Sequence, residues 1–407
     1  MKKLIKTKKA LIISFSNLNT DPRVLRQIDF IGTDFEIHTA GIKASNHRNE
    51  ISHKTISTQF TIDLESSNSA LGRWLTLGYQ WPIFFFNWVR NYFTLVVVKN
   101  YESNYWTLHK KQLLNILLED SYDLIVANDI HALPLAIKIK ERNGTKVYFD
   151  AHEYAPLEYE NDPRWLRRIS PYLFYLCEKY IPFTDFCTTV GHIIAEEYEK
   201  LTGIHFDVVY NSPQYQQLPV SEVNGDLIRC VHHGVASPIR NIESMINAFI
   251  SLGSRFELNL LLMVDDKKYF NDLQELAASQ SNIIFHEPVP TENISKFINQ
   301  YDICLIFIPP INFNYKNGLP NKFFESVQAR LMLLCGPYPE MKLLVDKYGL
   351  GEIAEGFTSD DIEKSLRNIK TESILEHKNN SNKFAETLSA ETSMSLLVEG
   401  IRRLWKE

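Results

Sequence analysis

Short runs of apolar and β-branched residues alternate with amphipathic helical stretches along most of the 407 residues. This alternation is typical of parallel sheets that are covered by helices on both faces. One array of expected strands and helices extends from residue 9 to residue 209, and a second extends from 227 to about 335. We therefore predict an α/β fold with two Rossmann-like, doubly wound domains that face each other across a cleft. Ligands of such sheets bind at the carboxyl ends of the strands, so the cleft is the expected site.

The boundaries follow from the breaks in this pattern. Residues 1–212 would form the first domain and residues 227–390 the second. Between them, residues 213–226 have no hydrophobic period and are rich in turn formers and amides, which predicts a linker. Residues 391–407 contain an amphipathic helix that could return to brace the first domain. Within the first domain, the stretch from residue 41 to about 70 is expected to be irregular.

Composition excludes several classes of protein. The net charge of −6 argues against a nucleic-acid binder, which would normally be basic. The five cysteines are scattered and have no zinc spacing, so we expect reduced, buried thiols in a cytoplasmic protein and no metal. The apolar run after the lysine-rich start is too short for a signal peptide and is interpreted as the first buried strand.

An aromatic stretch at about residues 70–106 interrupts the first domain. It holds four of the six tryptophans, and no Asp or Glu occurs between Ser66 and Tyr101, whereas Arg73, Arg90 and Lys99 do. Aromatic and basic residues together suit an anionic membrane interface, which predicts peripheral contact with the inner face of the cell membrane. A helix pair packed inside the domain explains the composition equally well.

The segment Asn317-Gly-Leu-Pro-Asn-Lys-Phe-Phe-Glu325 follows a buried strand and opens a helix at about Asn321. Gly318 allows a turn, and Pro320 restricts the residue before it. A helix amino terminus offers free N–H groups to an anion such as a diphosphate. Glu325 lies one turn in, where a carboxylate can accept both hydroxyls of a ribose. A capped helix with a solvated glutamate is the alternative, and the residue pattern does not separate the two.

A second segment leaves the first strand of the second domain at His232-His-Gly-Val-Ala-Ser-Pro-Ile-Arg-Asn241. Gly234 permits close approach of a ligand to the backbone, and Arg240 can bind phosphate through two nitrogens. A loop arginine is more often simply solvated. His232 and His233 are predicted to pack at the end of the strand.

In the first domain, Asp150-Ala-His-Glu153 ends a strand, so His152 should point toward the cleft. Such a sequence alone could also be a surface loop or part of a metal site. Asp129 and His131 end the preceding strand and form a competing pair. Asn17 and Asn19, after the first strand, have either ordinary turn chemistry or a place in a loop that faces acceptor or phosphate.

These motifs together resemble GT-B-fold glycosyltransferases of the family-4 (group 1) type, in the branch that builds bacterial cell-surface polysaccharides. The resemblance covers almost the whole chain apart from about residues 45–105. It rests on seven motifs in the right order: 19–26, 128–134, 150–153, 188–192 with 209–213, 234–241, 288–290 and 319–325.

The resemblance implies roles for particular residues. The domain of residues 227–390 would bind a nucleoside-diphosphate sugar, and the domain of residues 1–212 would bind the acceptor. The implied donor-binding residues are Gly234, Arg240, Asn317, Gly318, Leu319, Pro320, Asn321, Lys322 and Glu325. Those implied in catalysis are His152, Arg240 and His131, and those on the acceptor side are Asn17, Asn19, Asp129, Asp150 and Glu153.

Two positions depart from the family pattern. No lysine follows shortly after Arg240, so Lys322 is its expected substitute. Asn317 stands eight positions before Glu325, where the family often has a second glutamate.

The resemblance predicts a metal-independent, cofactor-free hexosyltransferase acting with retention on a glycan or lipid-linked glycan, in the synthesis of capsule, O-antigen (lipopolysaccharide) or exopolysaccharide. The alternatives are a GT-B-fold sugar-nucleotide 2-epimerase and a non-catalytic subunit that binds nucleotide or glycan.

Overall fold

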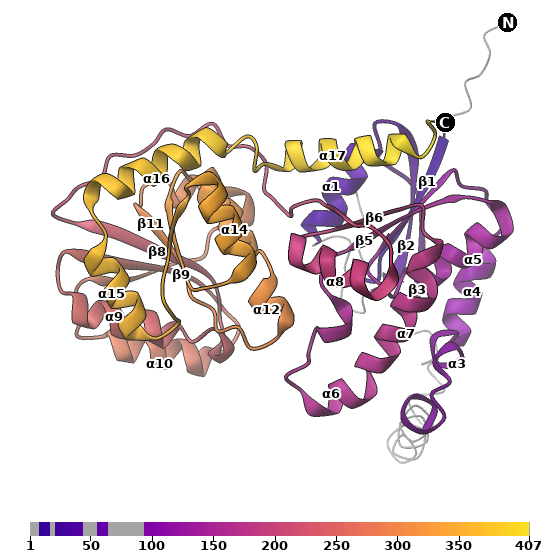
Figure 1. Ribbon diagram of the computed structural model, residues 1–407, viewed down its shortest axis with the longest axis horizontal. Helices are drawn as coiled ribbons and strands as arrows, with labels where there is room; N and C mark the ends of the chain where they lie inside the picture. Colours follow the sequence, from indigo (N-terminus) through magenta and orange to yellow (C-terminus); the bar gives the residue numbers. More distant parts are fainter. Residues whose placement is uncertain (1–7, 17–20, 44–54, 64–92, 407) are drawn as a thin grey trace, which may run out of the picture. The chain divides into compact units, whose positions relative to one another are not determined.

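The computed structural model describes residues 8–16, 21–43, 55–63 and 93–406. The chain forms two compact units: unit 1 comprises residues 1–209 and 396–407, and unit 2 comprises residues 210–395. Each unit is built on its own parallel sheet (Figure 1).

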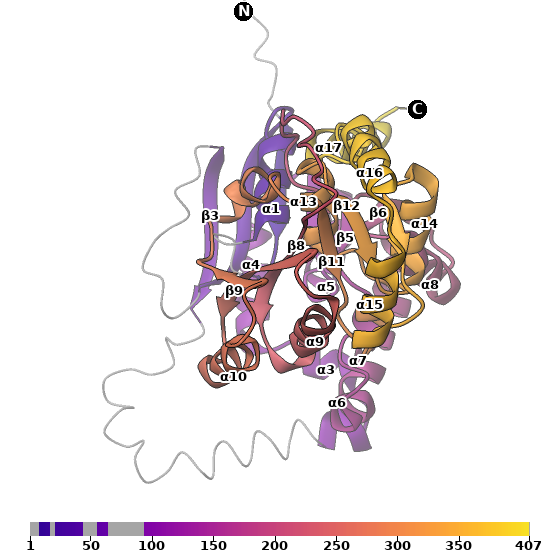
Figure 2. The same ribbon diagram turned by 90° about the vertical axis from the view of Figure 1, so that its left-hand side faces the viewer.

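The sheet of unit 1 has seven strands in the order β3-β2-β1-β4-β5-β6-β7, with β3 at one edge (Figure 2). Its strands are β1 (Lys8–Ile13), β2 (Phe35–Lys43), β3 (Ile56–Asp63), β4 (Leu124–Asn128), β5 (Lys146–Ala151), β6 (Phe186–Thr189) and β7 (Asp207–Val208). Its helices are α1 (Pro22–Ile31), α3 (Tyr101–Tyr105), α4 (Leu108–Leu117), α5 (Leu133–Asn143), α6 (Pro163–Arg168), α7 (Ser170–Tyr180) and α8 (His192–Thr202), with short turns η1 (Phe93–Val97), η2 (Ala155–Leu157) and η3 (Ile181–Phe183). All five residues of β4 are buried, as a parallel strand covered on both faces requires.

The sheet of unit 2 has six strands in the order β10-β9-β8-β11-β12-β13. They are β8 (Ile228–Ala236), β9 (Phe256–Val264), β10 (Ile283–His286), β11 (Ile303–Ile306), β12 (Met332–Cys335) and β13 (Gly351–Ile353). The helices are α9 (Ile242–Leu252), α10 (Lys267–Ala277), α11 (Ile294–Ile298), α12 (Phe313–Asn317), α13 (Asn321–Gln328), α14 (Pro339–Tyr348), α15 (Ser359–Asn368) and α16 (Thr371–Phe384), with turns η4 (Pro238–Arg240) and η5 (Thr291–Asn293). The last helix, α17 (Ala390–Arg403), extends from the end of unit 2 into the last residues of unit 1.

Alternating side chains of the unit 2 strands enter two separate cores. Leu258, Leu260 and Leu305 pack with residues of α9, α10 and α15, which lie side by side (Figure 1). Leu261 and Ile306 face the other way and pack with residues of α11, α13 and α14. The sheet is therefore buried on both faces, which explains why its strands are nearly continuous apolar runs in the sequence.

Both sheets reverse their strand order once. In unit 1 the neighbours at the reversal are β1 and β4, and in unit 2 they are β8 and β11. Doubly wound sheets bind ligands outside the carboxyl ends of the two strands at such a switch point, because the loops after them turn to opposite faces. Each unit therefore has one such position.

Several elements differ from the sequence-based expectation. The irregular stretch expected after residue 40 contains β3, which pairs with β2 as an edge strand. The region after β12 folds into α14, β13, α15 and α16, for which no elements were predicted.

Residues 213–226, expected to be a linker, are part of unit 2 and bond to the rest of it. The Arg330 guanidinium donates to the Gln216 carbonyl at 2.5 Å, and the Ser221 hydroxyl donates to the Asn299 carbonyl at 2.8 Å. Turn-forming composition predicted the lack of helix and strand here, but not that the backbone would bond to one unit. At the other end of the chain, Arg402 pairs with Asp34 of unit 1 at 2.8 Å.

All five cysteines are buried free thiols. In the ranges that the structure describes, no helix has both the length and the apolar character needed to cross a bilayer. Most of the aromatic stretch, including Trp74, Trp81 and Trp88, lies outside the described residues.

Candidate active site

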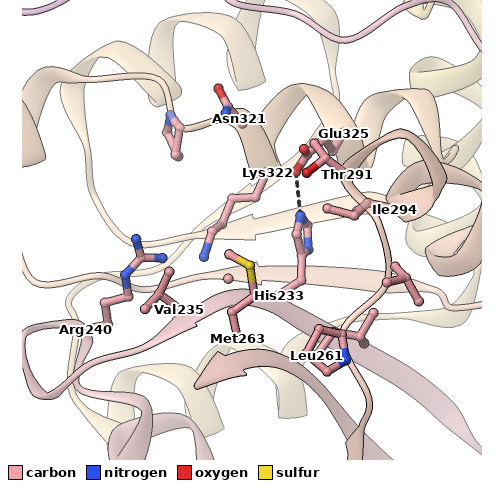
Figure 3. Close-up of a pocket in the computed structure, with 14 residues that line it drawn as sticks. His233, Val235, Arg240, Leu261, Met263, Thr291, Ile294, Asn321, Lys322 and Glu325 are labelled. Carbon is pink, nitrogen blue, oxygen red and sulfur yellow. Dashed lines mark hydrogen bonds and ion pairs between the residues drawn. The ribbon is translucent and has the colours of Figure 1, made fainter. Parts of the chain in front are cut away.

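A pocket of about 250 Å³ opens in unit 2 at the carboxyl end of β8, beside the amino terminus of α13 (Figure 3). It is lined by His233, Gly234, Val235, Arg240, Leu261, Met263, Pro288, Val289, Thr291, Ile294, Pro320, Asn321, Lys322 and Glu325. Its position matches the switch point of the sheet.

Two cations flank a glycine at one end of the pocket. A Cβ atom on Gly234 would lie 2.7 Å from Arg240 Nη1 and 3.3 Å from Lys322 Nζ, and the φ of Gly234 is 142°. Any other residue would therefore push both cations away and strain the backbone. No carboxylate of the described residues lies within ion-pair distance of either cation. The positive charge at this end of the pocket is thus uncompensated.

The Lys322 ammonium is buried and is held by a neutral histidine. Its Nζ donates to His232 Nε2 at 3.3 Å, and His232 Nδ1 donates to the Leu305 carbonyl at 2.8 Å. Burial and the nearby Lys322 lower the pKa of His232 well below its ordinary value, so its Nε2 is an acceptor. Burial, and then Arg240, lower the pKa of Lys322 to about 7. An anion entering the pocket would reverse this effect and favour the ammonium form.

Glu325 lies one turn into α13 and faces the same pocket (Figure 3). Its Oε2 accepts a hydrogen bond from His233 Nε2 at 2.7 Å. Burial lowers the pKa of His233 although Glu325 opposes the shift, so a neutral imidazole makes this bond. The His233 Nδ1 atom is buried without a hydrogen-bond partner, which fits the tautomer that carries its proton on Nε2. The histidine orients the carboxylate while leaving its second oxygen for a ligand hydroxyl.

The remaining wall of the pocket is apolar. Leu261 and Met263 come from β9, and Val289 and Ile294 come from the segment that follows β10. The pocket therefore combines an apolar wall, two cations and one oriented carboxylate. These are complementary to a base, a diphosphate and a ribose, respectively.

The structure brings together six of the nine residues expected to bind donor: Gly234, Arg240, Pro320, Asn321, Lys322 and Glu325. Asn317, Gly318 and Leu319 do not line the pocket. The Asn317 side-chain amide donates to the Phe313 carbonyl of its own short helix at 3.0 Å. A Cβ on Gly318 would lie 2.5 Å from the Asn314 carbonyl oxygen, so Gly318 is needed for close backbone packing.

His232 and His233 were predicted to pack at the end of a strand, and both are indeed buried. Their bonds to Lys322 and Glu325 could not be predicted from the sequence, because the residues of each pair are about 90 positions apart in the chain. The only signal was the position of both histidines immediately before Gly234.

In unit 1, His152 is enclosed by acceptor groups. Its Nε2 lies 3.2 Å from Asn128 Oδ1 and 3.3 Å from Asp150 Oδ2, and its Nδ1 lies 3.4 Å from Asp129 Oδ2. Burial alone would lower the pKa of His152, but Asp129 and Asp150 outweigh it and raise the pKa. Asp129 has a φ of 62°, a left-handed conformation at the end of β4. The surroundings of His152 therefore favour its cationic form.

Asp150 is fully buried, and its oxygens are already bonded. Arg23 Nε and Nη2 donate to it at 2.6 and 2.5 Å, Gln27 donates at 2.5 Å and Thr188 at 2.7 Å. Burial alone would raise the pKa of Asp150, but Arg23 holds it far below the ordinary value. The carboxylate is not presented to a ligand in this structure, and it orients Arg23 and His152 instead.

Two of the other residues expected in unit 1, Glu153 and His131, lie near the Asp129 carboxylate. Partial burial of the carboxyl group, with Glu158 and Asp129 nearby, raises the pKa of Glu153 to about 7. His131 lies beyond β4, where the Tyr105 hydroxyl donates to its carbonyl oxygen at 2.7 Å. Asn17 and Asn19 lie outside the described residues.

No known family model matches the sequence, and no curated protein sequence matches it either. The structure, in contrast, is similar to many solved structures. For HepE from Anabaena, solved in complex with UDP and glucose, the TM-score is 0.67 at 12% identity, covering 97% of this chain and 100% of that chain. For sucrose-phosphate synthase from Thermosynechococcus elongatus the TM-score is 0.67 at 11% identity, with 97% and 98% covered. For an α,α-trehalose-phosphate synthase (UDP-forming) from Burkholderia vietnamiensis it is 0.64 at 10% identity, with 97% and 100% covered.

At this low identity the similarity shows the fold. The chain has the α/β GT-B fold, with parallel sheets of seven and six strands in two Rossmann-like units. This confirms the predicted fold class.

Proposed function

We propose that this chain is a glycosyltransferase that transfers a hexose from a UDP-sugar, bound in the unit 2 pocket, to a hydroxyl of a glycan or lipid-linked glycan. The observation that carries the proposal is the pair of uncompensated cations, Arg240 and Lys322, beside Gly234 and opposite Glu325 in one pocket. A buried ammonium without a carboxylate is costly, and a bound diphosphate would offset that cost.

The choice of nucleotide follows from the structural neighbours. HepE is described with UDP and glucose, and the trehalose-phosphate synthase is described as UDP-forming. In the proposed complex the uracil contacts the apolar wall, Glu325 accepts the ribose hydroxyls, and the diphosphate lies between Arg240, Lys322 and the amino terminus of α13.

The proposed chemistry needs stabilisation of a leaving group. The bond between the anomeric carbon and the diphosphate oxygen breaks, and the electron pair leaves with UDP. The acceptor hydroxyl oxygen bonds to the anomeric carbon, and its proton passes to an oxygen of the departing diphosphate. Arg240 and Lys322 stabilise the negative charge that develops on the diphosphate, a role that a metal ion fills in other enzymes. We therefore propose a metal-independent reaction, with retention as in the family that the sequence resembles.

The acceptor and the pathway rest on the sequence resemblance. We propose a role in the assembly of capsule, O-antigen or exopolysaccharide. We propose that the aromatic stretch at about residues 70–106 contacts the inner face of the membrane, because it combines aromatic with basic residues.

Glu325→Ala should weaken UDP-glucose binding by about 100-fold, because two hydrogen bonds to a charged acceptor are lost. Isothermal titration calorimetry measures this loss directly. Glu275→Ala, which removes an exposed glutamate of α10, is the matched control and should bind like the wild type. Equal affinities of the two variants would exclude the pocket as the donor site.

A turnover assay then separates the proposed function from its rivals. A glycosyltransferase releases UDP in an acceptor-dependent reaction that continues in EDTA, whereas a 2-epimerase releases free epimerised sugar without acceptor. The bonding of Asn317 within its own helix, away from the pocket, favours a non-catalytic binding subunit as the second candidate. Tight donor binding without turnover across a panel of sugar donors and acceptors would favour that subunit.

A further inference from the structure

Unit 1 has a second group of basic side chains at its own switch point. We propose that Lys110 and His131 form a binding site for a phosphoryl group there, separate from the pocket of unit 2. The sequence predicted phosphate binding for neither residue, and it predicted no role at all for Lys110.

The first observation is position. His131 follows β4, and Phe15 follows β1, the neighbouring strand at the reversal of the sheet. Lys110, in the first turn of α4, places its Nζ 5.6 Å from the centroid of the Phe15 ring and 3.7 Å from that of Tyr105. The Tyr105 hydroxyl donates to the His131 carbonyl at 2.7 Å, so Tyr105 contacts both Lys110 and His131. The cluster thus occupies the place where sheets of this kind bind ligands.

The second observation is charge. Within the described part of the chain, no carboxylate lies within ion-pair distance of the Lys110 ammonium, and no protein acceptor bonds to the His131 ring. The nearby Asp129 carboxylate bonds to the His152 backbone N–H and lies 3.4 Å from its ring. Lys110 and His131 are therefore not neutralised by the protein.

The pKa shifts agree with this arrangement. Burial lowers the pKa of Lys110 to about 8. Burial and Lys110 lower the pKa of His131, and Asp129 only partly opposes the shift. The other titratable groups around them are the hydroxyls of Tyr105 and Tyr172. A dianion placed between Lys110 and His131 would favour both protonated forms and take up protons as it binds.

The chemistry of the cluster suits a phosphate ester. An ammonium and an imidazolium can both donate to phosphate oxygens, and the Tyr105 and Phe15 rings provide an apolar face beside them. If the proposed function holds, the ligand of unit 1 is the acceptor, so the acceptor carries a phosphoryl group. That group could belong to a soluble phosphorylated sugar or to a lipid phosphate. The anion site itself does not depend on the proposed function.

The experiment observes His131 directly, using the full chain with histidines labelled at ¹³Cε1. The His131→Gln variant assigns its NMR signal. Glucose 6-phosphate should shift the His131 signal and raise its pKa. Lys110→Met should weaken this response about tenfold or more, because a charge-assisted hydrogen bond is lost. Lys111→Met, which removes the exposed neighbour on α4, should leave the response unchanged.

Two further variants serve as controls. Lys110→Arg keeps the charge and should retain binding, which separates loss of the cation from damage to the fold. Arg240→Met should leave the His131 response intact, because that residue belongs to the other unit. If the wild type does not bind UDP-glucose but its His131 response is intact, the proposed function alone is refuted.

A sedimentation experiment with lipid vesicles identifies the source of the phosphoryl group. Phosphatidylcholine vesicles with and without phosphatidic acid are sedimented with wild type, Lys110→Met and Lys111→Met. Binding that needs phosphatidic acid and Lys110 indicates a lipid phosphate, and a His131 response to glucose 6-phosphate alone indicates a soluble ligand. Absence of both responses, or a response that Lys110→Met leaves unchanged, would overturn the site.

Discussion

The two units reverse their strand order in the same way, but they differ in whether a buried positive charge is paired with a carboxylate. In unit 1, Arg23 is almost fully buried at the end of the sheet and is paired through two nitrogens with Asp150. In unit 2, the buried Lys322 has only a neutral histidine as its partner, and Arg240 beside it has no carboxylate among the described residues. A compensated buried charge holds the fold together, whereas an uncompensated one indicates a ligand that supplies the missing charge.

Within unit 2, two buried lysines, Lys322 and Lys378, differ in the same way. Lys378 is as buried as Lys322, but its Nζ donates to Ser221 Oγ at 2.8 Å and the Tyr301 carbonyl at 2.9 Å, and lies 3.2 Å from Asp302 Oδ1. Asp302 directly precedes β11, so this pair lies at the amino end of the strand, away from the switch point. The compensated lysine is thus at the end of the sheet where ligands do not bind.

The largest expected effect tests the compensated pair of unit 1. Asp150→Asn should lower the free energy of unfolding by about 3–5 kcal/mol, because it leaves the Arg23 guanidinium buried without a counter-charge. Urea unfolding followed by circular dichroism measures the change, and hydrogen exchange of β5 peptides locates it in unit 1.

The control for Asp150→Asn is an exposed ion pair of the same unit. Asp34→Asn breaks the pair with Arg402, whose side chain is 57% exposed, and should cost less than about 1 kcal/mol. Equal losses from the two variants would mean that burial does not distinguish these pairs, and the comparison would fail.

The second prediction concerns pH and sharpens the contrast at Lys322. With a pKa of about 7 in the free pocket, Lys322 is protonated below that pH and loses its proton above it. A bound diphosphate raises this pKa, so UDP-glucose affinity should fall by up to about tenfold per pH unit above about pH 7. The other groups that face the ammonium are Arg240, His232, Glu325 and Cys304.

Calorimetry between about pH 7 and about pH 9 measures this dependence. UDP-glucose suits the test because its diphosphate is esterified at both ends and lacks the phosphate ionisation near pH 6. Lys322→Met should bind more weakly and show no comparable trend. A wild-type affinity that is constant over this range would show that Lys322 does not exchange its proton on binding.

The smallest expected effect is on stability. Lys322→Met should change the free energy of unfolding by less than about 1 kcal/mol, because the variant removes a buried charge without leaving a carboxylate unpaired. Lys378→Met, the matched variant in the same unit, should cost about 3 kcal/mol, because the buried Asp302 loses its nearer cation and keeps Arg229 at 3.7 Å as its charged partner. Thermal and urea unfolding of both variants compare them, and a large loss from Lys322→Met would place Lys322 among the structural groups.

Local motifs predicted more than isolated residues did. Gly234, Arg240 and Glu325 could be recognised because each belongs to a strand–turn or turn–helix segment whose geometry follows from its own residues. The family resemblance implied that Asp150 faces the acceptor, but its main partner Arg23 is 127 residues earlier in the chain. The family resemblance implied a donor-binding role for Asn317, eight positions before Glu325, but its amide bonds to the backbone of its own short helix α12.

The periodicity of the sequence determined the two parallel sheets of this protein, because hydrophobic alternation and turn chemistry act over only a few residues. The charge balance of each buried group was decided by the tertiary structure. Whether a lysine or arginine receives a carboxylate depends on strands and helices that the fold brings together from distant parts of the chain. For that reason the sequence predicted where ligands could bind, and only the structure showed which buried cations have no carboxylate partner among the described residues.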